Sequence, residues 1–225
     1  MPFRGLIFDF NGVLWWDGDI QALSWNRMAV ELRGVPFSGE EMAGWVHGRT
    51  NRTILEYLTG RPVAGGELAG LVERKESHYR RECLALGDAF RLSPGAVELL
   101  EFLEEREIPR TIATASDGTN VAFFFEHLGL SRWFDLRRVV CDDGTFPGKP
   151  APDIYLRAAR ALDLEPGSCL VVEDARAGIQ AAAAAGIGRI LALGPASRHE
   201  ELRSLPGVWR VIESLERLPR RELFG

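Results

Sequence analysis

The chain has 225 residues, and its 27 basic side chains against 32 acidic ones give a net charge of −5. This balance argues against a general nucleic-acid binder or a binder of anionic membranes, because both need a positive excess. An apolar content of 46% with 26% charged residues is typical of a globular protein, and without an 18-residue apolar run we expect no membrane span. The length fits one large domain, or a domain with a smaller insertion.

Along the first 90 residues a strand-like segment gives way to a helical pattern. Residues 6–8 are apolar and precede Asp9, as at the end of a buried parallel strand. From 18 to 88 the pattern is helical, and residues 67–83 predict an exposed amphipathic helix. The candidate helices are separated by Pro36, Gly39, Gly60, Pro62 and the pair Gly65 and Gly66.

After residue 93 helices and strands alternate, which predicts a parallel sheet covered on both faces. The expected helices are 95–106, 118–129, 151–162 and 175–185, and the expected strands are 110–115, 137–141, 170–172, 189–193 and 208–212, before a short last helix. We therefore expect an α/β fold, with a doubly wound parallel-sheet core (1–16 and 89–225) and an inserted all-helical domain (17–88).

Lysine is rare in this chain, since Lys75 and Lys149 are the two lysines among 27 basic residues and the other 25 are arginine. Lys149 stands in a loop before a helix, where a compact charge suits a carboxylate and a phosphate. Lys75, between Arg74 and Glu76 in the charged helix, is expected to face solvent.

Three cysteines, Cys83, Cys141 and Cys169, lack CxxC spacing, which favours reduced thiols in a cytoplasmic protein. The start of the chain runs into an apolar strand and is not patterned like a signal peptide. We expect a monomer or a weak homodimer.

Polar residues gather where the expected strands end, the edge at which open parallel sheets bind ligands. Carboxylates, hydroxyls and one lysine would suit Mg²⁺ together with a phosphate, although each residue alone would also suit a turn or a helix cap. These residues are Asp9, Asn11, Thr114, Ser116, Lys149, Glu173 and Asp174.

Five segments in order resemble the motifs of the haloacid dehalogenase-like superfamily, in the branch with a helical cap after the first strand. They are LIFDFNGVL (6–14), LSPGAVELL (92–100), TIATAS (111–116), GKPAPDIY (148–155) and LVVEDARAGIQAAAAAGI (170–187). The resemblance covers essentially the whole chain. It implies phosphoryl chemistry on a small phosphorylated metabolite, as in the phosphatases, β-phosphoglucomutase-like and phosphoglycolate phosphatase-like members.

The resemblance also implies roles for single residues. Asp9 would be the nucleophile and form an aspartyl-phosphate. Thr114, the backbone at Ala115 and Lys149 would bind the phosphoryl group. Mg²⁺ would bridge nucleophile and phosphate, held by Asp9, the backbone carbonyl of Asn11, Glu173 and Asp174.

Asn11 departs from the family pattern, which has an acid/base aspartate at this position. An amide cannot shuttle a proton, and that help is typically worth about 10²–10⁴-fold in rate. Three explanations stay open: a slow phosphatase, a proton supplied by a cap residue such as His47 or His78, or an impaired protein that binds phosphate ligands.

Other chemistries of the family fit the cap less well. Its sugar phosphomutases carry a histidine four residues ahead of a tryptophan, whereas Gln21 precedes Trp25 here. Phosphonate-cleaving members need a lysine in the region 48–53, and the dehalogenases use no metal. We expect a Mg²⁺-dependent phosphomonoester hydrolase, with a sugar phosphomutase as an alternative. Arg49, at a turn of the cap, is a candidate contact for an anionic substrate group.

Overall fold

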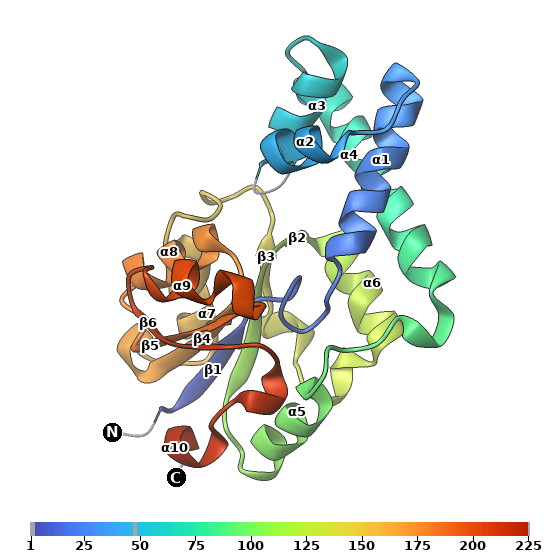
Figure 1. Ribbon diagram of the computed structural model, residues 1–225. Coiled ribbons are helices and arrows are strands. Elements are labelled where there is room, and N and C mark those ends of the chain that lie inside the picture. Colours follow the sequence, from blue (N-terminus) through green and yellow to red (C-terminus); the bar gives the residue numbers. More distant parts are fainter. Residues whose placement is uncertain (1–2, 47–48, 225) are drawn as a thin grey trace. The chain divides into compact units, whose positions relative to one another are not determined.

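The computed structural model describes residues 3–46 and 49–224, and the chain divides into two compact units (Figure 1). One unit combines Met1–Trp16 with Arg91–Gly225, and the other is Asp17–Phe90. The first contains every strand of the described chain, and the second is helical. We call them the α/β unit and the helical unit.

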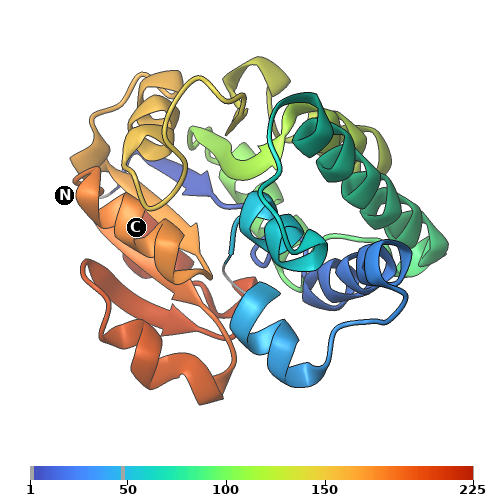
Figure 2. The same ribbon diagram turned by 90° about the horizontal axis from the view of Figure 1, so that it is seen from above.

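Six strands of the α/β unit form one sheet in the order β3-β2-β1-β4-β5-β6, and all the pairings are parallel. Strand β1 therefore lies inside the sheet, between β2 and β4 (Figure 2). This confirms the predicted parallel α/β fold with a helical insertion after the first strand. The strands are β1 (Gly5–Phe8), β2 (Arg110–Asp117), β3 (Val140–Asp142), β4 (Cys169–Glu173), β5 (Arg189–Leu193) and β6 (Val208–Ile212).

Strand β3 begins three residues later than the predicted strand 137–141. Residues 136–138 form a 3₁₀ turn instead, in which the Asp135 side chain accepts a hydrogen bond from the backbone N–H of Arg137. Such a side-chain acceptor offers the backbone an alternative to strand pairing. The apolar residues that follow then pair with β2.

Helices cover both faces of the sheet because successive strand residues point to opposite sides. Ile7 packs in a core with residues of α7 and α8, whereas its neighbour Phe8 meets Phe134 edge-on. Phe124 of α6 stacks on Phe10 at 4.3 Å between ring centroids. The helices are α5 (Ala96–Glu105), α6 (Gly118–Leu128), α7 (Asp153–Ala161), α8 (Arg176–Ala184), α9 (His199–Arg203) and α10 (Arg220–Phe224).

The helical unit has its own apolar core, built from all of its longer helices. Trp25 and Met28 of α1 pack with Ile54 and Leu55 of α3 and with Leu71 of α4. Its elements are α1 (Gly18–Arg33), α2 (Gly39–Glu41), a π-helix (Met42–Val46), α3 (Asn51–Thr59) and α4 (Gly65–Ala85). Gly34 ends α1 at φ +83°, a conformation that favours glycine.

Lys75 does not face solvent as predicted, because α4 buries one of its faces and Lys75 is only 2% exposed. Its Nζ donates to Oε1 of Gln21 at 2.5 Å and lies 3.0 Å from Oε1 of Glu76. The rings of Trp25 and Tyr79 lie 5.4 and 5.2 Å from the ammonium. The spacing of four residues from Leu71 to Lys75 and from Lys75 to Tyr79 places it on the apolar stripe of the helix.

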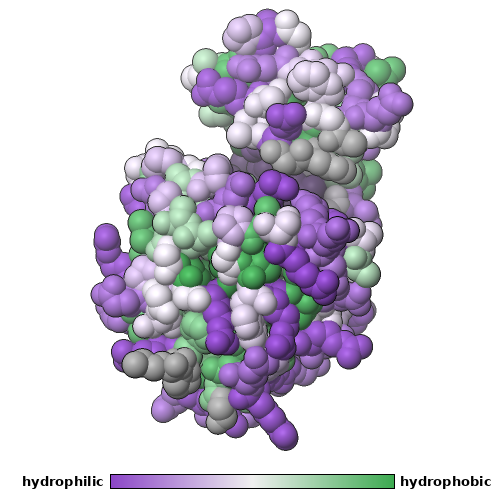
Figure 3. Space-filling view, turned by 60° about the vertical axis from the view of Figure 1, so that its left-hand side comes forward, coloured by the Kyte–Doolittle hydropathy of each residue, from purple (hydrophilic) through white to green (hydrophobic). Residues whose placement is uncertain are grey.

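The surface is mostly hydrophilic on the face in Figure 3, where hydrophobic side chains appear in small patches. None of the helices in the described part of the chain is long and apolar enough to cross a membrane.

Candidate active site

The candidate site begins where strand β1 ends. The backbone N–H of Asp9 donates to the carbonyl of Val172 in β4, which aligns the ends of the two strands. The chain then turns, with the N–H of Gly12 bonded to the carbonyl of Trp15 at 2.7 Å. Gly12 has φ +80°, and a Cβ there would overlap the carboxylate of Asp174. The turn therefore requires glycine, and it brings the loop that follows β1 against the end of β4.

Lys149 joins two carboxylates from different strands. Its Nζ lies 2.6 Å from Oδ1 of Asp9 and 2.6 Å from Oε1 of Glu173, and it reaches the carbonyl of Ala113 at 3.3 Å. Burial alone would lower the pKa of Lys149, but the two carboxylates outweigh burial and raise it above its usual range. The lysine is therefore a permanent cation at the ends of β1, β2 and β4.

Glu173 is fully buried and accepts four hydrogen bonds. Its Oε1 accepts from Lys149 and from the Tyr155 hydroxyl at 2.8 Å. Its Oε2 accepts from the backbone N–H groups of Asp174 and Ala175 at 2.9 and 3.0 Å. Both oxygens therefore have partners within the protein, and this carboxylate fixes the positions of the lysine and of the loop after β4.

Tyr155 and Gly178 are parts of this arrangement that the sequence analysis did not identify. Tyr155 stands in the same GKPAPDIY segment as Lys149, and that proximity was an available signal. Gly178 lies in α8 directly against Glu173, where a Cβ would overlap the carboxylate. Nothing in the sequence pattern marks that close approach.

Asp9, Glu173 and Asp174 offer carboxylate oxygens that lie within 4.8 Å of one another. These three carboxylates and the single ammonium of Lys149 leave an excess of two negative charges. Burial raises the pKa of Asp9 to about 7, with the Lys149 ammonium opposing this shift and the Glu173 carboxylate adding to it. A hard divalent cation would balance the charge with the oxygen donors that it prefers, so the residues fit Mg²⁺.

Asn11 and Ser116 meet beside these carboxylates. The Ser116 hydroxyl donates to Oδ1 of Asn11 at 2.8 Å, and the backbone N–H of Ser116 donates to the Thr114 hydroxyl oxygen at 3.1 Å. Thr114 is buried within β2, three residues before the strand ends at Asp117, whereas the next residue, Ala115, is exposed. The structure thus brings Asp9, Lys149, Glu173 and Asp174 together, with the contact between Asn11 and Ser116 at the same edge of the sheet.

The candidate residues of the helical unit have local partners. Arg49 is exposed, and its guanidinium lies 3.4 Å from the carbonyl of Gly44. His78 is buried, with Nε2 2.8 Å from Oε1 of Glu31 and Nδ1 in contact with Arg81. His47 lies outside the described residues.

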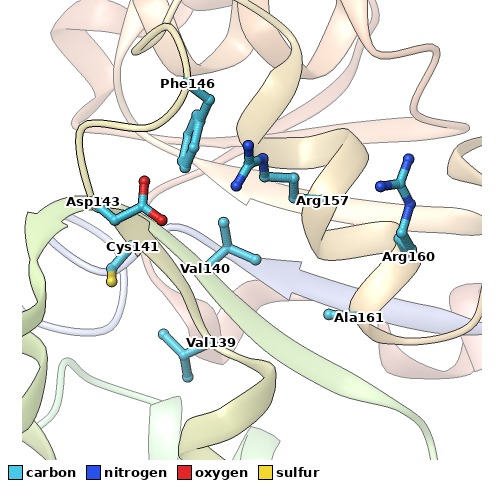
Figure 4. Close-up of a pocket in the computed structure, with 8 residues that line it drawn as sticks. All are labelled: Val139, Val140, Cys141, Asp143, Phe146, Arg157, Arg160 and Ala161. Atoms are coloured by element: carbon cyan, nitrogen blue, oxygen red, sulfur yellow. The ribbon is translucent and has the colours of Figure 1, made fainter.

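A surface hollow of about 360 Å³ lies elsewhere in the α/β unit, along β3 and α7. Figure 4 shows Phe146 beside the Arg157 guanidinium, which is 4.2 Å from the ring centroid, and Arg160 farther along the helix. None of the candidate catalytic residues lines this hollow.

Known proteins resemble this chain over most of its length. A family model described as haloacid dehalogenase-like hydrolase matches residues 3–186. Fructose-1-phosphate phosphatase from Escherichia coli is 40% identical over 188 residues, which cover 84% of this chain and 95% of that protein. Hexitol phosphatase A from Escherichia coli is 30% identical over 219 residues, which cover 97% and 94%.

Among solved structures, a HAD hydrolase of family IA, variant 3, from Entamoeba histolytica superposes with a TM-score of 0.91 at 34% identity. The match covers 98% of this chain and 97% of that one. The matched motifs, the parallel sheet and the clustered carboxylates have one common explanation: the chain belongs to the haloacid dehalogenase-like hydrolases.

Proposed function

We propose that the protein is a Mg²⁺-dependent phosphatase that hydrolyses a phosphomonoester of a small sugar or related metabolite, with Asp9 as the nucleophile. The observation that carries this proposal is the placement of Asp9 in contact with Lys149 and within 4.8 Å of the other two carboxylates. The names of the two Escherichia coli phosphatases described above indicate a phosphorylated sugar and a phosphorylated sugar alcohol as substrates. Because both proteins resemble this chain over most of its length, they support the same substrate class here.

In the first step, a carboxylate oxygen of Asp9 attacks the phosphorus of the substrate. The bond between phosphorus and the alcohol oxygen breaks, an aspartyl-phosphate forms, and the released alkoxide takes its proton from water. Lys149, 2.6 Å from Asp9, stabilises the negative charge of the transferring phosphoryl group. Water then attacks the aspartyl-phosphate and releases inorganic phosphate and free Asp9.

Asp9, Asp174 and the backbone carbonyl of Asn11 would hold the Mg²⁺, which would supply positive charge to offset the repulsion between the carboxylates and an anionic phosphate. Glu173 belongs to the same cluster of carboxylates. Its four hydrogen bonds support a role in orienting Lys149 and the loop that carries Asp174, in place of the direct ligand role expected from the motif. The Thr114 hydroxyl and the N–H at Ala115 receive the phosphoryl oxygens.

Asn11 stands at the position where an acid/base group would act. Its amide can donate a hydrogen bond to the leaving oxygen, but it cannot deliver a proton. The reaction is therefore slow, and it favours substrates whose leaving group needs little protonation.

A screen of phosphate release over a panel of sugar and organic phosphates, with and without Mg²⁺, tests this function. We expect Mg²⁺-dependent release with the wild type and none with Asp9→Asn. An isomeric sugar phosphate in place of free phosphate would indicate a mutase. If phosphorylated compounds bind saturably in the presence of Mg²⁺, and neither the wild type nor Asn11→Asp turns them over, the protein is a phosphate-ligand-binding protein.

A further inference from the structure

Asn11 is followed directly by Gly12, and this pair occurs once in the chain. The side-chain amide of an asparagine can be attacked by the backbone nitrogen of the next residue. Glycine there presents no side chain to hinder the attack. Gly12 is also obligatory for the fold, because its φ is +80° and a Cβ would overlap Asp174. Any chain with this turn and an asparagine at position 11 therefore contains the reactive pair Asn11-Gly12.

Ser116 supplies a second feature that favours the attack. Its hydroxyl donates to Oδ1 of Asn11 at 2.8 Å. This hydrogen bond withdraws electron density from the Asn11 side-chain carbonyl carbon and stabilises the negative charge that develops on Oδ1 when a nucleophile adds. Asn11 is also only partly buried, so water can reach the side chain.

We propose that Asn11 is a site of self-deamidation, assisted by Ser116, which converts the amide to a carboxylate and supplies the proton-transfer group that the site lacks. The inference rests on the proposed function, since it concerns how that same site gains its acid/base group. Deamidation of Asn11 makes the purified protein a mixture of an amide form and a more active carboxylate form.

The chemistry needs water as its only co-reactant. The Gly12 nitrogen bonds to Cγ of Asn11 and closes a five-membered succinimide, and the side-chain nitrogen leaves as ammonia with the proton from the Gly12 N–H. Water then adds at Cγ, the new bond between nitrogen and Cγ breaks, and a proton returns to the Gly12 nitrogen. One water is consumed, one ammonia is released, and a carboxyl group remains at position 11. Addition of water at the other succinimide carbonyl gives the isoaspartyl form.

A backbone hydrogen bond of Gly12 limits the rate of the reaction. The Gly12 N–H donates to the carbonyl of Trp15 at 2.7 Å, and this bond has to open before the nitrogen can attack. Local opening of a loop is infrequent relative to closed states. We therefore expect conversion to be slow compared with turnover, and to continue during storage of the folded protein.

Peptide mass mapping of the purified protein over a time course of incubation tests the proposal. The peptide that contains Asn11 should gain the mass of an amide-to-acid conversion, and chromatographic separation of its aspartyl and isoaspartyl forms gives the aspartyl fraction. Phosphate release should rise in proportion to that fraction, toward a gain of about 10²–10⁴-fold for the pure aspartyl form. Asn26, Asn51 and Asn120, which precede Arg27, Arg52 and Val121, are internal controls that should stay unchanged.

Two variants make the test specific. Asn11→Gln keeps an amide but would need a larger ring, so its mass should not change. Ser116→Ala keeps the Asn11-Gly12 pair without the hydrogen bond, so conversion should slow several-fold. An unchanged wild-type mass, or equal conversion in Ser116→Ala, would overturn the proposal. Inactivity of Asn11→Asp over the phosphate panel would overturn the proposed function instead, and the mass change would still decide whether deamidation occurs.

Discussion

Nζ of Lys149 lies 2.6 Å from Oδ1 of Asp9, although 140 positions separate the two residues in the chain. The parallel sheet creates this contact, because the ends of its central strands meet at one edge. Lys149 reaches Glu173 at the same distance, so one cation serves two strand ends.

Lys149→Arg should lower phosphate release by about 10²–10³-fold, the typical cost of removing a group that stabilises developing charge. The guanidinium keeps the charge, but it is broader and differently directed than an ammonium. Its space is limited by Tyr155, whose ring centroid lies 5.2 Å from Nζ. Steady-state kinetics and unfolding in urea should show a lower kcat with a folded protein. Wild-type kcat in Lys149→Arg would contradict the requirement for a compact cation.

Asn11→Asp should raise phosphate release by about 10²–10⁴-fold, because a carboxyl group can protonate the leaving oxygen and then activate water. The gain should be largest for substrates with poor leaving groups. Asn11→Ser, which keeps a small polar side chain without a titratable group, is the control. Equal rates for the wild type and Asn11→Asp across the panel would mean that proton transfer is supplied elsewhere.

Gly178→Ala should reduce activity and destabilise the protein by about 1–3 kcal/mol, the usual cost of forcing extra atoms into a packed site. The added Cβ would overlap Glu173, whose carboxylate then has to move away from Lys149. Gly70→Ala is the matched control, since Gly70 lies within helix α4 with open space at its Cβ position. That change should stabilise the helix slightly. Urea unfolding of both variants checks the pair, and equal effects would contradict the close approach.

Lys75→Met should destabilise the helical unit by about 3–5 kcal/mol, because it leaves the buried Glu76 carboxylate and the partly buried Gln21 without the ammonium. Arg74→Ala, at the exposed neighbouring position, should change stability by less than about 0.5 kcal/mol. Thermal or urea unfolding measures both. A neutral Lys75→Met variant would mean that the buried ion pair contributes nothing net.

The order of strands and helices could be predicted because hydrophobic runs and breaker residues are local signals. The carboxylates at the strand ends could also be predicted, because Asp9 and Glu173 each directly follow an apolar run. The charge of Lys75 predicts exposure, but its spacing from Leu71 and Tyr79 places it on the buried face of α4. The space that Gly178 leaves for Glu173, and the hydrogen bond from Ser116 to Asn11, depend on packing between distant segments, so no local pattern reveals them.

Removal of Mg²⁺ by a chelator should abolish phosphate release, and added Mg²⁺ should restore it. The three clustered carboxylates need a divalent cation to offset their charge before an anionic phosphate can approach. Differential scanning fluorimetry should show a higher melting temperature with Mg²⁺ for the wild type and a smaller rise for Asp174→Asn. Full activity in excess chelator would contradict a metal-assisted reaction.

During turnover Asp9 should carry the phosphoryl group as an aspartyl-phosphate. Acid quenching of the reaction with a good substrate, followed by peptide mass mapping, tests it directly, because Asn11 should slow hydrolysis of the intermediate and let it accumulate. We predict a phosphoryl group on Asp9 in the wild type and less of it in Asn11→Asp, which should clear the intermediate faster. Phosphate release that persists in Asp9→Asn, or turnover with the phosphoryl group on another residue, would rule out Asp9 as the nucleophile.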